Sequence, residues 1–246
     1  MANYKITVSY DGAGYFGWQR LKDKPTIQGT IEDALEEVFH RPCMIHGAGR
    51  TDRGAHAEGQ VFSVDLPDEP AAESMQRTIE EALPSQIRIV GLEPVDRDFH
   101  ALKAALGKIY RYVIWNAPQC PADLEGRVWH VPAPLAVEPM REACRVFVGD
   151  RDFASFATRP NFKQKSTCRN VRRVTFEEDG PRISITMEAD GFLYKMVRNV
   201  VRAIVKVGEG RIQVEELQAI LDACDRKAAP GTAPASGLYL DAVQYE

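Results

Sequence analysis

Short runs in which hydrophobic and polar positions alternate, or in which β-branched residues cluster, predict β-strands along the whole chain. They cover residues 5–10, 61–66, 87–92, 109–115, 173–177, 182–188 and 238–243. Hydrophobic positions spaced three or four residues apart predict amphipathic helices between these strands. The helices are expected at residues 27–38, 74–83, 140–148, 191–207 and 214–223. Because the two kinds of element interleave, we expect an α+β fold with mostly antiparallel sheets.

The order of elements repeats in a comparable form after Leu106, which predicts two halves of similar size. We place the first half at residues 1–105 and the second at residues 106–246, so that the last strand belongs to the second half. A chain of 246 residues suits one large domain or two small ones, and a hydrophobic content of 44% is typical of folded proteins.

The composition argues against several classes of protein and site. No apolar stretch approaches the ~18 residues that a membrane span requires, and the N-terminus lacks the apolar core of a signal peptide. We therefore expect a cytoplasmic protein without a membrane partner. The cysteines are scattered and never spaced as CxxC, and the histidines form no metal-binding motif, so neither a disulfide framework nor a metal site is expected.

Two basic regions stand out against a net charge of −4. Residues 159–173 carry cations, including Arg169, Arg172 and Arg173, and no carboxylate. In the predicted helix at residues 191–207, cations share one side, hydrophobic residues fill the other, and no acidic residue neutralises the charge. These cations are Lys195, Arg198, Arg202 and Lys206. Both regions suit the phosphates of a nucleic acid, and a solvated charged surface is the alternative interpretation.

The segment HGAGRTDRGAHA, residues 46–57, predicts a tight loop because glycines interrupt it. Within it Asp52 lies close to Arg50, Arg53 and His56, and positive neighbours favour an ionised carboxylate. Such an aspartate suits a nucleophile or an electrostatic stabiliser, and a salt bridge that only holds the loop is the alternative. The segment matches neither the P-loop nor the dinucleotide-binding pattern.

Two tyrosines of the predicted strand at residues 109–115 lie on one face. Tyr110 and Tyr112 are two positions apart, while Arg111 and Val113 face the other way. We expect one tyrosine to be buried in the core. The other would form a platform on which an unstacked nucleobase rests.

Several motifs together resemble one family. GRTDRGAHA at residues 49–57 is similar to the GRTDxGVHA signature of the tRNA pseudouridine synthase A family, and further blocks match in the same order along nearly the entire chain. They are YDGxxYxGWQ at 10–19, TIQGxIE at 26–32, DFHA at 98–101, KxYRY at 108–112, DFxSF at 152–156, FLYxMVRN at 192–199 and GLYL at 237–240. The resemblance implies a pseudouridine synthase fold, in which two ferredoxin-like halves flank a central cleft.

The resemblance also implies an activity. A member of the family isomerises uridine to pseudouridine in tRNA without a cofactor, at positions 38, 39 and 40 of the anticodon stem-loop. By resemblance Asp52 is the nucleophile, Tyr110 stacks on the base and takes a proton, and Arg198 pairs with Asp52. Arg50 resembles the arginine that fills the space of a flipped base. We expect a homodimer that binds the anticodon arm of tRNA and no DNA, with further contacts from Arg53, His56, Arg169, Arg172, Arg173, Lys195 and Arg202.

Two departures bear on the choice of uridines. The family often has arginine after DFHA, where this chain has Leu102 followed by Lys103, and the valine of the signature is Ala55 here. Three alternatives remain at this point: a catalytically silent tRNA-binding module, a paralogue that modifies other uridines, and a glycoside-cleaving hydrolase with Glu58 as its proton donor.

Overall fold

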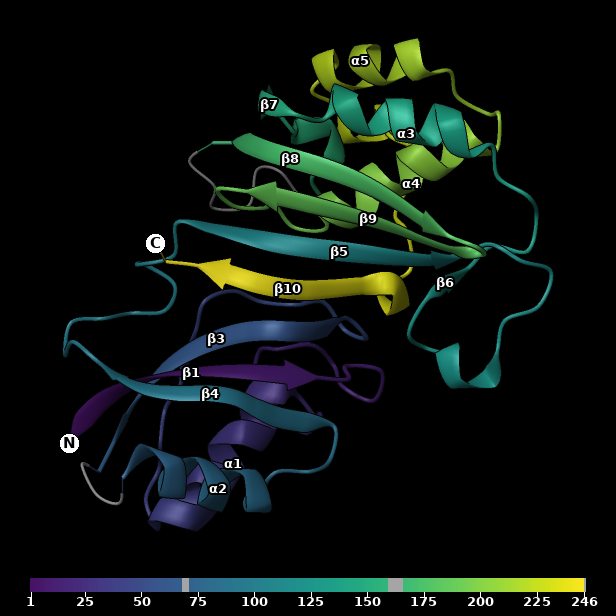
Figure 1. Ribbon diagram of the computed structural model, residues 1–246. Coiled ribbons are helices and arrows are strands. Elements are labelled where there is room, and N and C mark those ends of the chain that lie inside the picture. Colours follow the sequence, from purple (N-terminus) through teal and green to yellow (C-terminus); the bar gives the residue numbers. More distant parts are fainter. Residues whose placement is uncertain (68–70, 159–165, 246) are drawn as a thin grey trace. The chain divides into compact units, whose positions relative to one another are not determined.

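A computed structural model describes residues 1–67, 71–158 and 166–245 of the chain. The chain forms two compact units (Figure 1). The first is Met1–Leu106 with the C-terminal strand from Tyr239 onward, and the second is Gly107–Leu238. The break after Leu106 lies beside the predicted one. The structure differs from the predicted division at the C-terminus, because the last strand pairs with a strand of the first unit.

The sheet of the first unit has the strand order β4-β1-β3-β10. Its strands are β1 (Ala2–Tyr10), β3 (His56–Leu66), β4 (Ile87–Val95) and β10 (Leu238–Gln244), and the short β2 (His46–Gly47) pairs with β3. β1 is antiparallel to both neighbours, with Ile6 opposite Phe62 in β3 and Leu92 in β4. β10 runs parallel to β3. Ile6 and Phe62 are buried, which explains the hydrophobic alternation of these strands.

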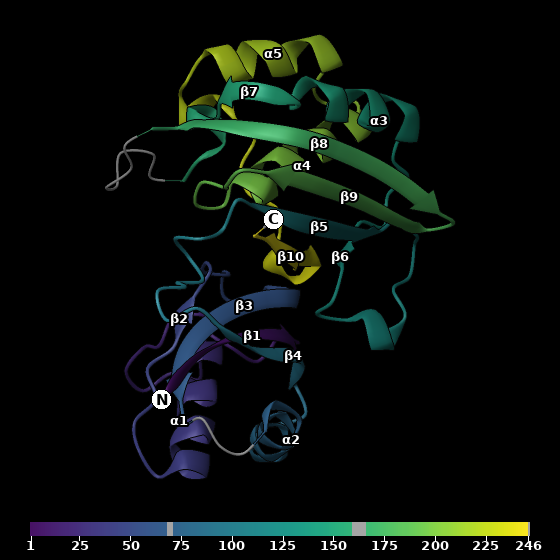
Figure 2. The ribbon, with the colours of Figure 1, turned by 60° about the vertical axis from the view of Figure 1, so that its left-hand side comes forward.

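Two helices, α1 (Ile27–Phe39) and α2 (Ala72–Ala82), cover one face of this sheet (Figures 1 and 2). The side chain of Thr26 caps α1 by accepting a hydrogen bond from the Gly29 N–H at 3.2 Å. Ile31 and Leu35 of α1 and Ile79 of α2 are buried in the core of the unit. The core therefore lies between the helices and the sheet.

The sheet of the second unit has the strand order β5-β9-β8-β7, and its neighbouring strands are antiparallel. Its strands are β5 (Gly107–Trp115), β7 (Gly149–Asp152), β8 (Cys168–Asp179) and β9 (Arg182–Ala189), and the short β6 (Trp129–His130) runs parallel to β5. Tyr112 of β5 lies opposite Ile185 of β9, and both side chains are fully buried.

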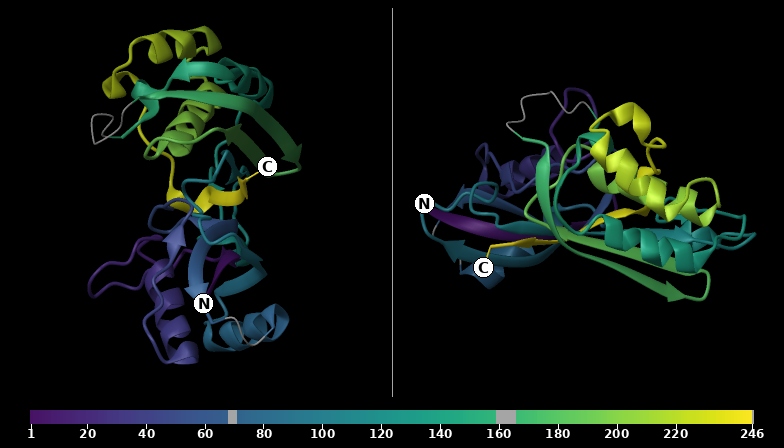
Figure 3. Two further views of the ribbon diagram at one scale, coloured as in Figure 1. Left: turned by 90° about the vertical axis from the view of Figure 1, so that its left-hand side faces the viewer. Right: turned by 90° about the horizontal axis from the view of Figure 1, so that it is seen from above.

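Three helices, α3 (Val137–Val146), α4 (Met196–Gly208) and α5 (Val214–Asp222), lie on one side of this sheet (Figure 3). Short 3₁₀ turns occur at Ala122–Leu124, Ala154–Phe156, Arg226–Ala228 and Ala235–Gly237. Val200, Val201, Ile204 and Val205 of α4 are buried, as the hydrophobic side of the predicted helix requires. The structure confirms the predicted α+β class.

Some element bounds differ from the prediction for local reasons. The basic helix begins at Met196 rather than residue 191, and Lys195 before it has a left-handed backbone with φ 61°. The end of the predicted basic run, from Cys168, is part of β8, whereas residues 159–165 of that run lie outside the described residues. In the described part of the chain, no helix combines the length and apolarity that crossing a membrane requires.

Candidate active site

The glycine-rich segment that carries Asp52 lies in the first unit and is supported by β3. After β2, the Ala48 N–H donates a hydrogen bond to the Val61 carbonyl at 2.7 Å. The buried Gln60 side chain then donates to the Gly49 carbonyl at 3.2 Å. The segment is therefore the end of a strand pairing followed by a tight turn, with its backbone polar groups bonded to the sheet.

The segment that follows β1 holds the same turn from its other side. The hydroxyl groups of Tyr10 and Thr51 lie 2.8 Å apart, and both residues are buried. The Trp18 N–H donates to the Thr51 carbonyl at 3.2 Å, and the Gly54 N–H donates to the Tyr15 carbonyl at 3.3 Å. Residues on both sides of the candidate nucleophile are thus bonded to a neighbouring segment.

Two glycines permit this close approach. A Cβ atom added at Gly12 would lie 1.9 Å from the Ala55 carbonyl oxygen, which the present arrangement of these backbones does not tolerate. Gly17 has φ +90°, and a Cβ there would lie 2.8 Å from the Thr51 carbonyl oxygen. Gly14, between them, has open space around it. The YDGxxYxGWQ motif therefore contains glycine where the backbone of the candidate active-site turn passes closest.

The turn itself spans Asp52 to Ala55. The Ala55 N–H donates to the Asp52 carbonyl at 3.1 Å, and Asp52 is half-buried. The exposed guanidinium group of Arg53 lies 4.1 Å from the centre of the Phe16 ring, a cation–π contact. Arg50 is exposed. The two arginines nearest to Asp52 in the sequence are thus both exposed in the structure.

His56 has a structural environment. Its side chain is 2% exposed, and its ring stacks on Tyr239 with centroids 4.7 Å apart. The Gly12 N–H donates to His56 Nδ1 at 3.2 Å, and the Asp11 carboxylate lies 3.1 Å from the same nitrogen. The enclosed ring connects β3, β10 and the turn after β1. Its burial is better explained by a role in holding that turn than by direct contact with a substrate.

In the second unit Tyr110 and Tyr112 share one face of β5, as predicted. Tyr110 is 8% exposed and meets the Phe192 ring edge-on, with centroids 5.0 Å apart. Tyr112 is fully buried, and its hydroxyl donates to the Pro234 carbonyl at 2.7 Å. Burial raises the pKa of Tyr112, and the positive charges of Arg198 and Arg202 oppose that rise. Both tyrosines are therefore buried, and Tyr112 is the more deeply buried of the pair.

The α4 helix brings its cations to the same face of β5. Arg198 is half-buried, and its Nε donates to the Ala233 carbonyl at 2.8 Å. The Ala233 N–H in turn donates to the Arg198 carbonyl at 3.1 Å. The guanidinium group of Arg202 lies 5.2 Å from the centre of the Trp129 ring. Both arginines are thus held at defined places between α4 and the segments packed on it.

The ordered motifs, the Asp52 turn and the α+β units agree with the similarity of this sequence to known proteins. The sequence profile of the tRNA pseudouridine synthase family matches residues 6–102 and 143–246. The chain belongs to this family. The tRNA pseudouridine synthase A of Methylacidiphilum infernorum is 42% identical over 245 residues, which cover 100% of this chain and 96% of the relative. That of Thermodesulfovibrio yellowstonii is 36% identical over 254 residues, with 100% of both chains covered.

The site residues that the family resemblance implies are divided between the two units. Asp52 and Arg50 lie in the first unit, and Tyr110 and Arg198 lie in the second. Within the second unit the structure brings the Tyr110 strand and the Arg198 helix together. The pairing of Arg198 with Asp52 stays a prediction. No group of three His, Cys, Asp or Glu side chains in the described ranges gathers in a way that suits a metal ion.

The basic residues of the second unit carry counter-charges that sequence analysis missed. Glu209, one residue after α4, pairs with Lys206, with Arg202 at 3.9 Å and with Arg211 at 3.2 Å. The helix itself contains no carboxylate, as predicted, but the residue that follows it neutralises part of the charge at its C-terminal end. The spacing of three residues from Lys206 to Glu209 is a signal that identifies such a pair.

A second carboxylate acts on the basic run. Glu188 of β9 lies 3.0 Å from Arg173, the residue opposite it in the antiparallel β8. It also lies 3.9 Å from Arg172, which occupies an irregularity in the same strand pairing. Arg169, by contrast, donates to the backbone carbonyls of Ser166 and Cys168 at 3.0 Å and 2.6 Å. Lys195 lies 5.2 Å from the centre of the exposed Tyr194 ring. Only strand pairing, which the sequence does not specify, reveals the role of Glu188.

Proposed function

We propose that the protein isomerises uridine to pseudouridine at positions 38, 39 and 40 of the tRNA anticodon stem-loop, with Asp52 as nucleophile. As a member of the pseudouridine synthase family it is an isomerase that acts on tRNA uridine. The observation that carries the assignment of Asp52 is its position on a tight turn that backbone hydrogen bonds hold from both sides. A fixed carboxylate is what an attack on one carbon atom requires.

The reaction needs no external group, because its atoms are only rearranged. The bond between C1′ of the ribose and N1 of the base breaks, the base turns, and C5 bonds to C1′. C5 then loses its proton and N1 gains one, so that the product has the same composition as the substrate. Asp52 adds to the base or assists at the sugar carbon, and an ionised carboxylate serves in both schemes. No cofactor is part of this scheme.

The remaining roles concern the second unit. Tyr110 stacks on the target base and takes a proton, and Arg198 pairs with Asp52 when the site is assembled. The other tRNA contacts are Arg169, Arg172, Arg173, Lys195 and Arg202. When these side chains bind phosphate groups of the tRNA, the phosphates would replace some of the carboxylates with which they now pair. We place the enzyme in the cytoplasm as a homodimer on the anticodon arm of tRNA.

The decisive experiment replaces the proposed nucleophile. Asp52→Asn keeps the shape of the side chain and removes its charge, so release of tritium from C5-labelled uridine in tRNA should stop. The affinity for tRNA should stay within about tenfold, or ~1.4 kcal/mol, of the original. Pseudouridine has the mass of uridine, so its position is mapped by chemical derivatisation. Turnover by the Asn variant at the original rate would end the assignment.

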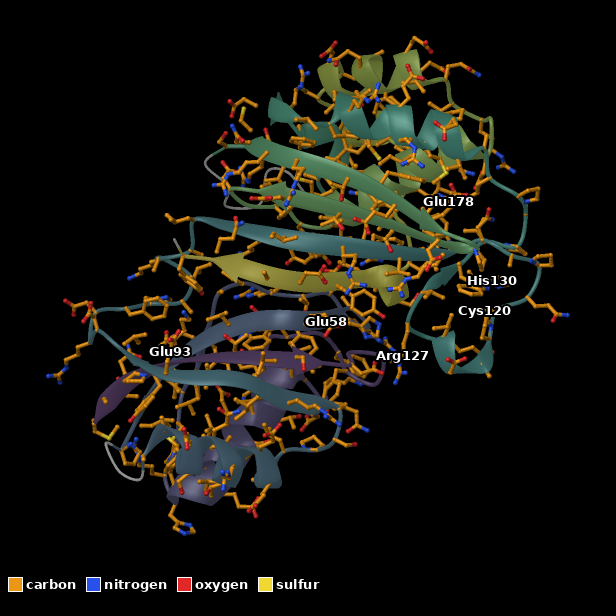
Figure 4. The ribbon with its side chains drawn as sticks, in the orientation of Figure 1. Glu58, Glu93, Cys120, Arg127, His130 and Glu178 are labelled. Atoms are coloured by element: carbon orange, nitrogen blue, oxygen red, sulfur yellow. The ribbon has the colours of Figure 1, made fainter. Side chains whose placement is uncertain are left out.

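A matched control separates this proposal from a hydrolase. Glu58 is an exposed carboxylate of β3 in the same unit (Figure 4). A glycoside-cleaving enzyme needs a second carboxyl group as proton donor, and it releases free base. The Glu58→Gln variant should therefore isomerise uridine at the original rate and release no base. Binding of tRNA without pseudouridine formation by the unaltered protein would indicate a silent binding module.

A further inference from the structure

Lys108 occupies an unusual position in the second unit. It lies two residues before Tyr110 on β5, so both side chains leave the strand on the same face. In the antiparallel register Lys108 is opposite Ala189, and Tyr110 is opposite Met187. Ala189 and Met187 are fully buried, and Lys108 is half-buried. The ammonium group is therefore attached to the apolar face of the sheet, at the end where β5 begins.

The opposite face of the same strands is built differently. There Ile109 is opposite Glu188, and this carboxylate pairs with the arginines of β8. The cations of the polar face thus have a counter-charge, whereas the ammonium group of Lys108 has no hydrogen bond or ion pair to a described residue. Burial lowers the pKa of Lys108, and no neighbouring charge contributes to that shift. A half-buried cation without an anion is costly to keep, which favours a function that uses its charge.

The surroundings of Lys108 indicate which kind of anion it meets. The neighbouring Tyr110 is the proposed platform for the target base, and its ring is packed against Phe192. Farther along the same face, the charges of Arg198 and Arg202 act on Tyr112. Lys108 therefore lies beside the base platform, on a strand face that also faces two arginines of α4. A nucleotide whose base stacks on Tyr110 carries its phosphate groups a few ångströms from that base.

We propose that Lys108 binds a phosphodiester group next to the target uridine and thereby holds the extruded nucleotide on the Tyr110 platform. This inference rests on the proposed function and adds a substrate-binding residue to it. The phosphate supplies the counter-charge that the apolar face lacks. Binding at this place fixes one nucleotide, whereas the exposed arginines of β8 attract the tRNA as a whole.

The test compares Lys108→Met, Lys108→Arg and the exposed control Lys227→Met on an anticodon stem-loop RNA. Lys108→Met should raise KM at least tenfold, because one charged hydrogen bond is lost. In a plot of log affinity against log salt concentration, the slope should become less steep by about 0.7 to 0.9, the value for one phosphate contact. Lys108→Arg should recover most of both effects, and Lys227→Met should change neither. Thermal unfolding checks that the variants fold, since methionine suits an apolar face.

A second substrate identifies the phosphate. This RNA carries neutral methylphosphonate linkages on both sides of the target uridine. With it, the kcat/KM of the unaltered enzyme should fall toward the value of the Lys108→Met variant. The kcat/KM of the variant should fall little further on the same RNA, because the contact is already absent. Unchanged KM and salt slope in Lys108→Met would overturn the inference. So would a change confined to the pH profile of kcat, which indicates proton transfer instead. Turnover by the unaltered enzyme is measured first, because its absence refutes the proposed function itself.

Discussion

The hydroxyl groups of Tyr10 and Thr51 lie 2.8 Å apart, so the end of β1 is bonded directly to the residue before Asp52. Removing this bond with Tyr10→Phe leaves a buried Thr51 hydroxyl without its partner, which should cost about 1 kcal/mol of the free energy of unfolding. Because the bond positions the turn, kcat should fall several-fold while KM changes little. Denaturant unfolding and tritium release under saturating tRNA measure the two effects.

The control for this substitution lies in the same strand. Tyr4 is also buried, and its hydroxyl has no hydrogen bond to a described residue. Tyr4→Phe should therefore leave kcat unchanged. Equal loss of kcat in the two variants would mean that the hydroxyl of Tyr10 has no particular effect on the Asp52 turn.

Gly12 and Gly14 provide a matched pair within one motif. Gly12→Ala brings a Cβ to 1.9 Å from the Ala55 carbonyl oxygen, so either the turn moves or the segment after β1 separates from it. We expect a loss of roughly 3 kcal/mol or more of stability and at least a hundredfold loss of kcat/KM. Gly14→Ala meets nothing within 4 Å and should behave like the original enzyme. The two variants are compared by thermal unfolding and by initial rates.

The sequence predicted the strands and long helices because hydrophobic periodicity follows burial. The pairing of Tyr110 and Tyr112 on one face of β5 was predictable in the same way, since strand residues alternate. That Tyr112 is the core residue was not, because its hydroxyl is satisfied by Pro234, more than a hundred residues away in the chain. Local alternation cannot distinguish two tyrosines whose difference depends on a distant loop.

The counter-charges and the support of the turn were less predictable for a related reason. Glu188 neutralises Arg173 across two strands, and Gly12 contacts Ala55 across a loop. Both relationships depend on three-dimensional register. The C-terminal strand is a similar case, because its short parallel pairing with β3 assigns it to the first unit although it follows the second in sequence.

His100 should make stability depend on pH. Burial, the neighbouring His46 ring and Lys103 lower the pKa of His100, and the centroids of the two histidine rings lie 5.1 Å apart. His100 therefore binds a proton less readily in the folded protein than in the unfolded chain. The free energy of unfolding should therefore decrease as pH falls below the ordinary histidine pKa of 6.5, until His100 is protonated in the folded state as well. The effect is modest because the His100 side chain is only partly buried.

Two variants identify the source of this dependence in urea titrations at about pH 7.5 and 5.5. His100→Gln should make the loss of stability between these pH values smaller than in the original protein. His46→Gln should reduce it in part, because it removes only one of the causes that lower the His100 pKa. An identical loss in the original protein and in His100→Gln would show that other groups dominate this range.

Glu188 should limit the affinity of the second unit for tRNA. It lies 3.0 Å from Arg173 and 3.9 Å from Arg172, so a phosphate that binds these arginines competes with a carboxylate already in place. Glu188→Gln should strengthen tRNA binding at low salt by up to about tenfold, and the gain should vanish at high salt. Replacing both arginines by Gln should weaken binding. The slope of log affinity against log salt concentration should change by less than the ~1.8 expected for two unpaired cations, because Glu188 already neutralises part of their charge. The same replacement of exposed Arg145 on α3 is the control, and an unchanged affinity in Glu188→Gln would place the tRNA away from β8.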